Sequence, residues 1–158
     1  KQSVMELSHM LRHVLYDSGE QSTTLDKELD FLRNYIELMR IRYIDDVEIE
    51  LDAPDITTCR KVSLPPLLLI VLVENAFKHG ISYNRPSFID IDLSVQGENL
   101  CCTVKNSRHP SYVAQNSGIG LNNITKRMDM LFNRNYTLKI DRSNDEVYTV
   151  KMIIPIKR

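Results

Sequence analysis

A long apolar stretch near the middle of the sequence predicts a helix that is buried on every side. Residues 67–73 are apolar without interruption, and they lie between Pro65-Pro66 and the polar segment that ends at Gly80. Proline favours the first turn of a helix and glycine favours its end, so these signals predict one helix over 65–80. A helix that is apolar all round belongs inside a core. We therefore expect this helix at the centre of the fold.

The apolar residues elsewhere change from helical to alternating spacing. Helical spacing predicts helices over 3–16, 25–43 and 119–132, with Thr24 as N-cap of the second. Alternation predicts strands over 47–51, 88–95, 100–104, 137–141 and 147–154. The strands 88–95 and 100–104 should pair antiparallel across the turn at 96–99. The order predicts a sheet combined with several helices.

Composition excludes some classes of protein. Twenty basic against 21 acidic residues give a net charge of -1, so no global charge favours nucleic acid or an anionic membrane. Three cysteines without metal-type spacing indicate buried thiols in a reducing compartment. The longest apolar run is far below the roughly 20 residues of a membrane helix. Because the sequence opens at Lys1 without an initiator methionine and passes directly into the predicted helix, we expect more protein upstream.

Four polar side chains follow the apolar part of the central helix. Glu74 and Lys78 are four residues apart, as are Asn75 and His79, so the set covers adjoining faces of one helix. The set combines a carboxylate, an amide oxygen and two donor or cationic groups. Those are the groups that a magnesium-bound polyphosphate needs. The simpler interpretation is a solvated helix end, where Lys78 and His79 favour the helix dipole.

A second polar element precedes the helix at 119–132. Gly118 and Gly120 lie at its start, where free backbone amides and the helix dipole attract anions. The preceding residues, 106–117, lack periodicity, and a loop of this length is more often functional than accidental. We therefore expect a lid over a phosphate site.

The two elements, in this order and with a loop between them, resemble the N box and the second glycine box of the ATPase superfamily that includes gyrase, MutL and histidine kinases. The chain most resembles the LytS/YehU-type sensor histidine kinases. The matching residues are Leu7-Ser8, Leu11-Arg12, 25–42, Pro65-Pro66, 118–124 and Arg127. The resemblance implies an α+β fold, a two-layer sandwich of the Bergerat type with helices on one face of a mixed, mostly antiparallel sheet, preceded by a helical hairpin. It divides the chain into a helical segment, 1–44, and an ATP-binding catalytic domain, 45–158.

The resemblance also implies roles for single residues. Asn75 would ligate Mg²⁺, with Glu74 as a polarising carboxylate beside it. Lys78 and His79 would face the phosphates of ATP, and the box at Gly118, Gly120 and Leu121 would cradle them. The family's adenine box usually reads Asp-x-Gly, and this sequence has Lys105-Asn106-Ser107 there. An asparagine oxygen still accepts a hydrogen bond from the adenine amino group, so Asn106 is the adenine candidate.

The implied activity is that of a protein-histidine kinase. The chain would transfer the ATP γ-phosphoryl group to a histidine for relay to a response regulator of the LytTR type. The family's accepting histidine lies in an Asn-Pro-His-Phe-type motif that this chain lacks, so the fragment should not autophosphorylate alone. We expect a homodimer in the full-length protein and the cytoplasmic part of an inner-membrane protein, with no nucleic acid as partner.

Two other functions remain open. The changed adenine box suits a degenerate signalling scaffold without kinase activity. A clamp-forming ATPase of the MutL kind is disfavoured by the short lid and the helical hairpin. His9 and His13, four apart, could suggest a metal pair or a substitute phosphoacceptor, but we expect exposed helix residues. We expect His109 to be a solvated loop residue outside the site.

Overall fold

The computed structural model describes residues 21–43, 46–109 and 119–158. The elements in chain order are β1 (Thr23–Thr24), α2 (Leu25–Arg42), β2 (Val47–Asp52), α3 (Ile56–Lys61), β3 (Ser63–Leu64), α4 (Leu68–Gly80), β4 (Ser87–Gln96), β5 (Asn99–Ser107), α5 (Ile119–Phe132), β6 (Thr137–Asp141) and β7 (Val147–Pro155). The expected helix over 3–16, with His9 and His13, lies outside the described residues. Residues 110–117 of the expected lid also lie outside the described residues.

A five-stranded sheet in the order β2-β4-β5-β7-β6 forms one layer of the fold. β2 and β4 are parallel, and the other neighbouring strands are antiparallel. Between β2 and β4 the chain passes through α3, β3 and α4, the long crossover that a parallel pair requires. β4 and β5 form the expected hairpin, with Gly97 in the left-handed region at its turn. The mixed, mostly antiparallel sheet is thus confirmed.

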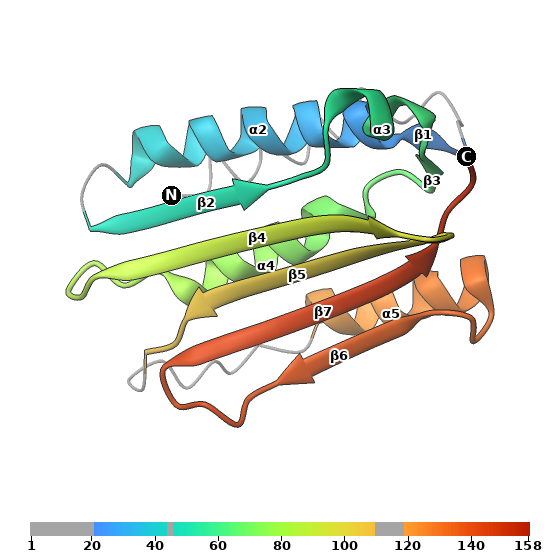
Figure 1. The fold of residues 1–158 in the computed structure, drawn as a ribbon. Coiled ribbons are helices and arrows are strands. Elements are labelled where there is room, and N and C mark those ends of the chain that lie inside the picture. The colour runs from blue at the N-terminus through green and yellow to red at the C-terminus, as the bar shows by residue number, and fades with distance from the viewer. Residues whose placement is uncertain (1–20, 44–45, 110–118) are drawn as a thin grey trace.

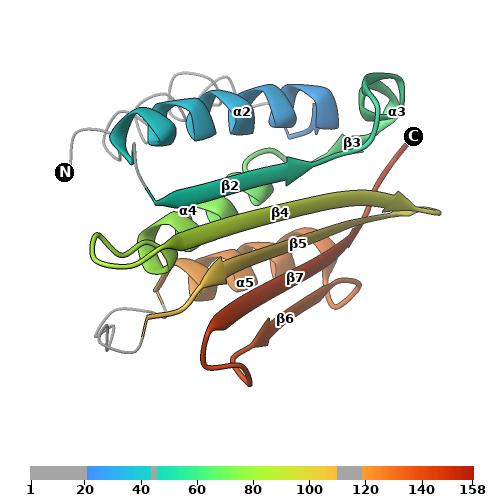
Figure 2. The same ribbon diagram turned by 60° about the vertical axis from the view of Figure 1, so that its left-hand side comes forward.

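The helices form a second layer. Figures 1 and 2 show α4 and α5 side by side behind the sheet, and α2 along its β2 edge on the side of α4. β1 and β3 make a separate antiparallel pair next to α2 and α3. The expected α+β sandwich with helices on one face is confirmed for the part of the chain that is described. Among the helices in that part, none is both long enough and apolar enough to cross a membrane.

α4 lies at the centre of the core, as its composition predicts. Leu68, Leu69, Ile70, Leu72 and Val73 are all fully buried. The apolar stripe of α2 and the inward residues of β4, β5 and β7 belong to the same core. Burying each such side chain contributes about 1.5–3 kcal/mol. One core therefore joins α2 to the sandwich.

The local structure differs from the sequence prediction at two places. Pro65-Pro66 precede α4 instead of opening it, because the chain turns sharply between β3 and the helix, and Leu67 takes a left-handed φ of +67° at this turn. Residues 56–61, to which the sequence assigned no element, form α3, and the Asp55 carboxylate caps the N-terminus of this helix by accepting a hydrogen bond from Thr58 N at 2.8 Å. A helix of six residues is too short to show periodicity in a sequence.

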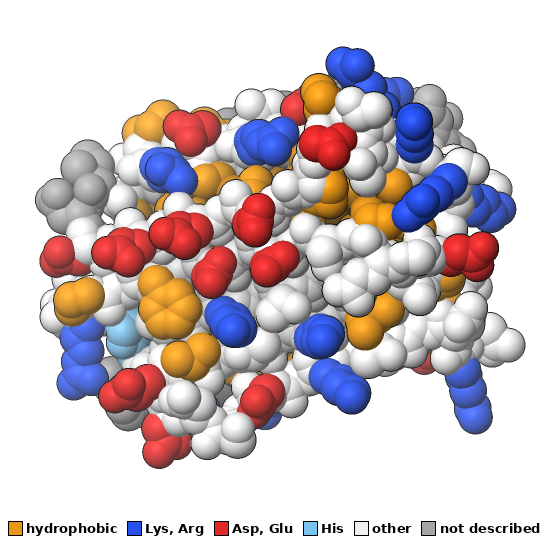
Figure 3. All heavy atoms as spheres, in the orientation of Figure 1, with side chains coloured by type: hydrophobic (Ala, Val, Ile, Leu, Met, Phe, Trp, Pro, Cys, Tyr) orange, Lys and Arg blue, Asp and Glu red, His pale blue; other side chains and the backbone are white. Residues whose placement is uncertain are grey.

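The other face of the sheet is open and charged. Figure 3 shows acidic side chains gathered over β2 and β4, with lysines on the neighbouring strands. In the register, Glu50 lies opposite Asp90, and Asp52 lies opposite Asp92. Like charges opposite one another cost stability unless water or counter-ions screen them. This face is therefore a solvated surface, and the core lies only on the helical side.

Cys59, Cys101 and Cys102 are all buried and unpaired, as expected. Burial raises the pKa of the Cys102 thiol to about 12. Because the thiolate is the reactive form, we expect Cys102 to resist alkylation by iodoacetamide at pH 8 in the native protein and to react once urea unfolds it. Mass spectrometry of the peptides measures this. Rapid labelling of Cys102 in the folded protein would contradict the buried position of β5.

Candidate functional site

The last two turns of α4 carry the four predicted polar residues. Glu74, Asn75 and His79 are half-exposed and Lys78 is exposed, whereas Ala76 and Phe77 between them are buried. The Phe77 ring packs edge-on against Tyr35 of α2, with ring centroids 5.5 Å apart. This contact fixes the rotation of the helix end. The polar side chains are therefore held on the outer surface of a buried helix.

Asn106 lies at the end of β5, directly against the end of α4. Its side chain is only 2% exposed, and its Nδ2 donates to the Ser107 carbonyl at 2.9 Å. A Cβ added to Gly80 would come within 2.7 Å of the Asn106 Cβ. Only glycine therefore allows α4 and β5 to approach this closely. The bond from Nδ2 to the Ser107 carbonyl orients the Asn106 amide, and the oxygen of such an amide can only accept hydrogen bonds.

Ser107 ties the same strand to the end of α4. Its Oγ donates to the Gly80 carbonyl at 2.5 Å and accepts from Phe88 N at 3.1 Å. Both the donor and the acceptor capacity of the buried hydroxyl are thus used. The last carbonyl of α4 gains a partner, which a buried helix end needs. Sequence reasoning assigned no role to Ser107 because this contact joins residues far apart in the chain.

Ser87 and His109 extend this polar network. Ser87 Oγ accepts from Ser82 N at 3.0 Å, and it lies 3.2 Å from Nε2 of His109. The segment after α4 is thereby held to the start of β4 and to the chain that leaves β5. His109, expected to be a solvated loop residue, is half-buried. That expectation was wrong, because Ser87 holds its ring.

A pocket of about 430 Å³ opens at the C-terminal end of α4. It contains Lys78 and His79, two tyrosines, and His109. The described residues that line it are Arg42, Tyr43, Phe77, Lys78, His79, Ile81, Ser82, Tyr83, Asn84 and His109. Tyr43 and Tyr83 lie with their ring centroids 6.0 Å apart. The two tyrosine rings, together with the cationic side chains of Arg42 and Lys78, suit a ligand that is partly aromatic and partly anionic.

The other predicted residues lie on elements next to this pocket. Glu74 and Asn75 are one turn earlier on α4 and do not line it. Gly120 and Leu121 belong to the first turn of α5, which packs beside α4, and Leu121 is buried in the core. Gly118 lies outside the described residues. The structure thus shows that α5 packs beside α4, while the phosphate-binding role of Gly118, Gly120 and Leu121 stays a prediction.

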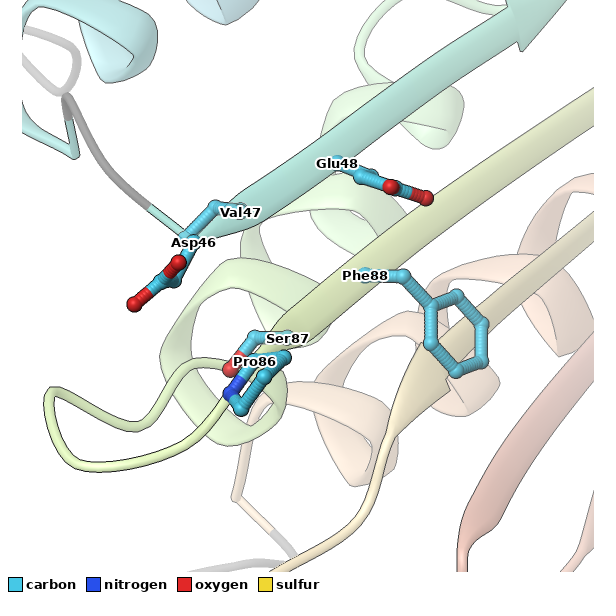
Figure 4. A pocket seen from close by; sticks show the side chains of 6 residues that line it. All are labelled: Asp46, Val47, Glu48, Pro86, Ser87 and Phe88. Carbon is cyan, nitrogen blue, oxygen red and sulfur yellow. The ribbon is translucent and has the colours of Figure 1, made fainter.

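A second hollow, of about 450 Å³, lies at the starts of β2 and β4. Figure 4 shows the six residues that line it: Asp46, Val47, Glu48, Pro86, Ser87 and Phe88. Its two acidic side chains would repel a polyphosphate. Within the described part of the chain, the end of α4 is therefore the better site for an anionic ligand.

The residues suit Mg²⁺ that arrives with a phosphate ligand. Among the described residues, no group of three His, Cys, Asp or Glu side chains could hold a metal ion by itself. Mg²⁺ is commonly bound through one or two protein oxygens together with substrate phosphates. The half-exposed amide of Asn75, with Glu74 beside it, fits that pattern.

Replacing Gly80 with alanine tests the close approach of α4 and β5. We expect Gly80→Ala to lower the free energy of unfolding by about 1–3 kcal/mol, because the new methyl group must displace Asn106. Urea denaturation measures this. Gly97→Ala is the control, since it introduces only the strain of a positive φ, with open space around the new methyl group. A Gly80→Ala variant as stable as the wild type would contradict the contact with Asn106.

The pKa of His79 gives the second prediction. Burial, and then the nearby charge of Lys78, lower this pKa below the ordinary 6.5. The unfolded chain therefore binds a proton more readily than the folded one, and stability should fall as the pH drops below about 6.5. Urea denaturation between pH 5 and pH 8 measures the slope. We expect His79→Gln to reduce it, and an unchanged slope would show that His79 is not the group responsible.

Comparison with known proteins relates the chain to one family. A family model described as "Histidine kinase" matches residues 1–47. The sensor histidine kinase/phosphatase LytS of Staphylococcus aureus (strain MRSA252) is 36% identical over 121 residues, which make up 77% of this chain and 19% of LytS. The chain thus spans about a fifth of the length of the LytS proteins it matches.

Solved structures share the fold. The catalytic domain of histidine kinase ThkA superposes with a TM-score of 0.61 at 15% identity, covering 85% of this chain and 94% of that domain. Full-length ShkA in complex with AMPPNP superposes with a TM-score of 0.57 at 16% identity, covering 96% of this chain and 36% of ShkA. The fold is that of histidine kinase catalytic domains. Together with the identity to LytS, this places the chain in the sensor histidine kinase family.

Proposed function

We propose that this chain is the ATP-binding catalytic domain of a two-component sensor histidine kinase. The observation that carries the proposal is the arrangement around α4. Its polar end combines a carboxylate, an amide and two nitrogen-bearing side chains and lies against the buried Asn106, and α4 packs beside α5. The structure of full-length ShkA in complex with AMPPNP, part of which shares this fold, supports the proposal.

Each predicted residue has a proposed role. Asn75 would hold Mg²⁺ on the phosphates, and Glu74 would polarise the reacting groups. Lys78 and His79 would contact the phosphates, and the backbone amides at Gly118, Gly120 and Leu121 would cradle them.

The side-chain oxygen of Asn106 would accept a hydrogen bond from the adenine amino group. Its burial at Gly80 supports this role, because a fixed acceptor at the floor of a site gives specificity. When bound, Mg²⁺ would supply charge neutralisation on the transferring phosphoryl group. The residues of this chain position the nucleotide, exclude water and direct donors at the phosphates, which is the main requirement of phosphoryl transfer.

The whole protein's activity and partners belong to the same proposal. The γ-phosphoryl group would pass to a histidine outside these residues and then to a response regulator of the LytTR type. The full-length protein would be a homodimer in the inner membrane, with this domain in the cytoplasm. The division into a helical segment, 1–44, and a catalytic domain, 45–158, is part of this proposal.

A degenerate signalling scaffold is the second candidate. The observation that favours it is Asn106 itself, because a neutral amide at this position lacks the charge that strengthens a hydrogen bond to adenine. If nucleotide binding has been lost, the domain would act by docking alone.

Titration with ATP and Mg²⁺ by calorimetry separates the two candidates. We expect saturable binding to the 158-residue chain. Asn75→Ala should weaken it by about tenfold or more, because loss of a metal ligand or its partners commonly has that effect. Asn34→Ala, at an exposed position on α2, is the matched control and should bind like the wild type. Absence of binding at millimolar ATP would leave the scaffold as the function.

A further inference from the structure

Glu28 is a buried carboxylate far from the proposed nucleotide site. It lies in the first part of α2, and only 1% of it is exposed. Its two oxygens accept from the backbone N–H of Leu67 at 3.3 and 3.2 Å. A buried carboxylate is costly unless it is hydrogen-bonded or paired. The bond to Leu67 therefore indicates a structural role for the Glu28 carboxylate.

Leu67 is the residue that leads into α4. It has a left-handed φ of +67°, and no side chain of its own caps the helix. Such a backbone conformation costs about 1–3 kcal/mol in a non-glycine residue unless its surroundings hold it. Glu28 supplies the missing acceptor from another helix, and its negative charge faces the N-terminal end of the α4 dipole. α2 therefore fixes the start of α4.

Arg127 brings α5 to the same turn. Its Nη2 donates to the Pro66 carbonyl at 2.5 Å. Burial lowers the pKa of this guanidinium, and the nearby charge of Glu28 opposes that effect. The turn at Pro66-Leu67 is thus held from one side by an acid of α2 and from the other by a base of α5. We call Glu28, Pro66, Leu67 and Arg127 the helix junction.

The helix junction lies at the opposite end of α4 from the polar residues. Lys78 is about 16 Å along the helix axis from Leu67, at a rise of 1.5 Å per residue. On α5, Gly120 is about 10 Å from Arg127 by the same rise. Helices packed in a core move as rigid bodies. A small change of angle at the junction would therefore change the distance between the two helix ends that form the proposed nucleotide site.

We propose that Glu28 and Arg127 are positioning residues that set the spacing of α4 and α5 and so couple α2 to nucleotide binding. The inference rests on the proposed function, because it concerns the same site. α2 is the first helix of the described residues and follows, in chain order, the segment for which the sequence predicts a further helix. A shift of α2 would move Glu28, release or tighten the turn at Leu67, and alter the cradle for the phosphates. ATP binding would in turn act back on the junction.

A different result is expected if Glu28 and Arg127 have only a structural role. Glu28 and Arg127 would then contribute to stability alone, and nucleotide affinity would not depend on them beyond the fraction of folded protein. Coupling requires that affinity change in the folded protein and that the two residues act as a unit.

The test uses Glu28→Gln, Arg127→Met and the double variant of the 158-residue chain. Calorimetry gives the ATP dissociation constant and urea denaturation gives the stability. We expect each single change to weaken ATP binding by about fivefold or more, and the double change to weaken it no further than the stronger single.

Two controls separate charge and stability from coupling. Glu37→Gln removes an exposed carboxylate on α2, and Ile49→Ala removes buried volume in β2. Both should leave the dissociation constant unchanged. If Glu28→Gln fails to fold, Arg127→Lys retains the charge and serves as the second variant, with partial loss of affinity expected.

Hydrogen exchange of the Leu67 amide in the wild type completes the test. Saturating ATP and Mg²⁺ should slow this exchange, although Leu67 lies far from the proposed site. Wild-type binding with unchanged affinity in the variants and unchanged exchange at Leu67 would overturn the coupling alone. Absence of ATP binding by the wild type would overturn the proposed function and the coupling with it.

Discussion

The burial of α4 is the constraint on which the rest of the structure depends. A helix that is apolar all round cannot be satisfied by one partner, so the sheet covers one side of it and α2 and α5 cover others. The inward residues of β4, Ile89, Ile91 and Leu93, alternate with polar residues on the open face. The same contacts that bury the helix leave its last two turns at the end of the sheet. Polar side chains on these last two turns can therefore reach a ligand, whereas the earlier part of α4 is buried in the core.

Polar groups mark both ends of this buried helix. Among the described residues, Ser87, Asn106 and Ser107 are buried at its C-terminal end, and Glu28 is buried at its start. Helix ends leave backbone donors and acceptors without partners inside the helix, and a buried end needs partners from elsewhere. The Gly80 carbonyl and the Leu67 amide receive them from β5 and α2. In the described part of the chain, four of the five buried polar side chains thus lie at the two ends of α4, and the fifth is Thr23 of β1.

The net charge of the chain is close to zero, but acidic and basic side chains gather on different parts of its surface. The chain has a net charge of -1, and its open sheet face is rich in carboxylates. The cations Arg42 and Lys78 lie at the rim of the pocket at the end of α4. A polyphosphate would be repelled by the first surface and attracted by the second. The proposed nucleotide site agrees with this distribution, and the hollow at the start of β2, with its two acids, does not.

The sequence by itself determined what depends on neighbours along the chain. The apolar run at 67–73 required a buried helix, alternation marked the strands, and the spacing of Glu74, Asn75, Lys78 and His79 placed them on one helix end. Tertiary structure decided what depends on distant residues. The acceptor for the Leu67 amide comes from Glu28, 39 residues away, and the approach of Asn106 to Gly80 joins a strand end to a helix end. Periodicity reports which face of an element is buried, but a hydrogen bond between elements depends on how they pack, and no local pattern records that.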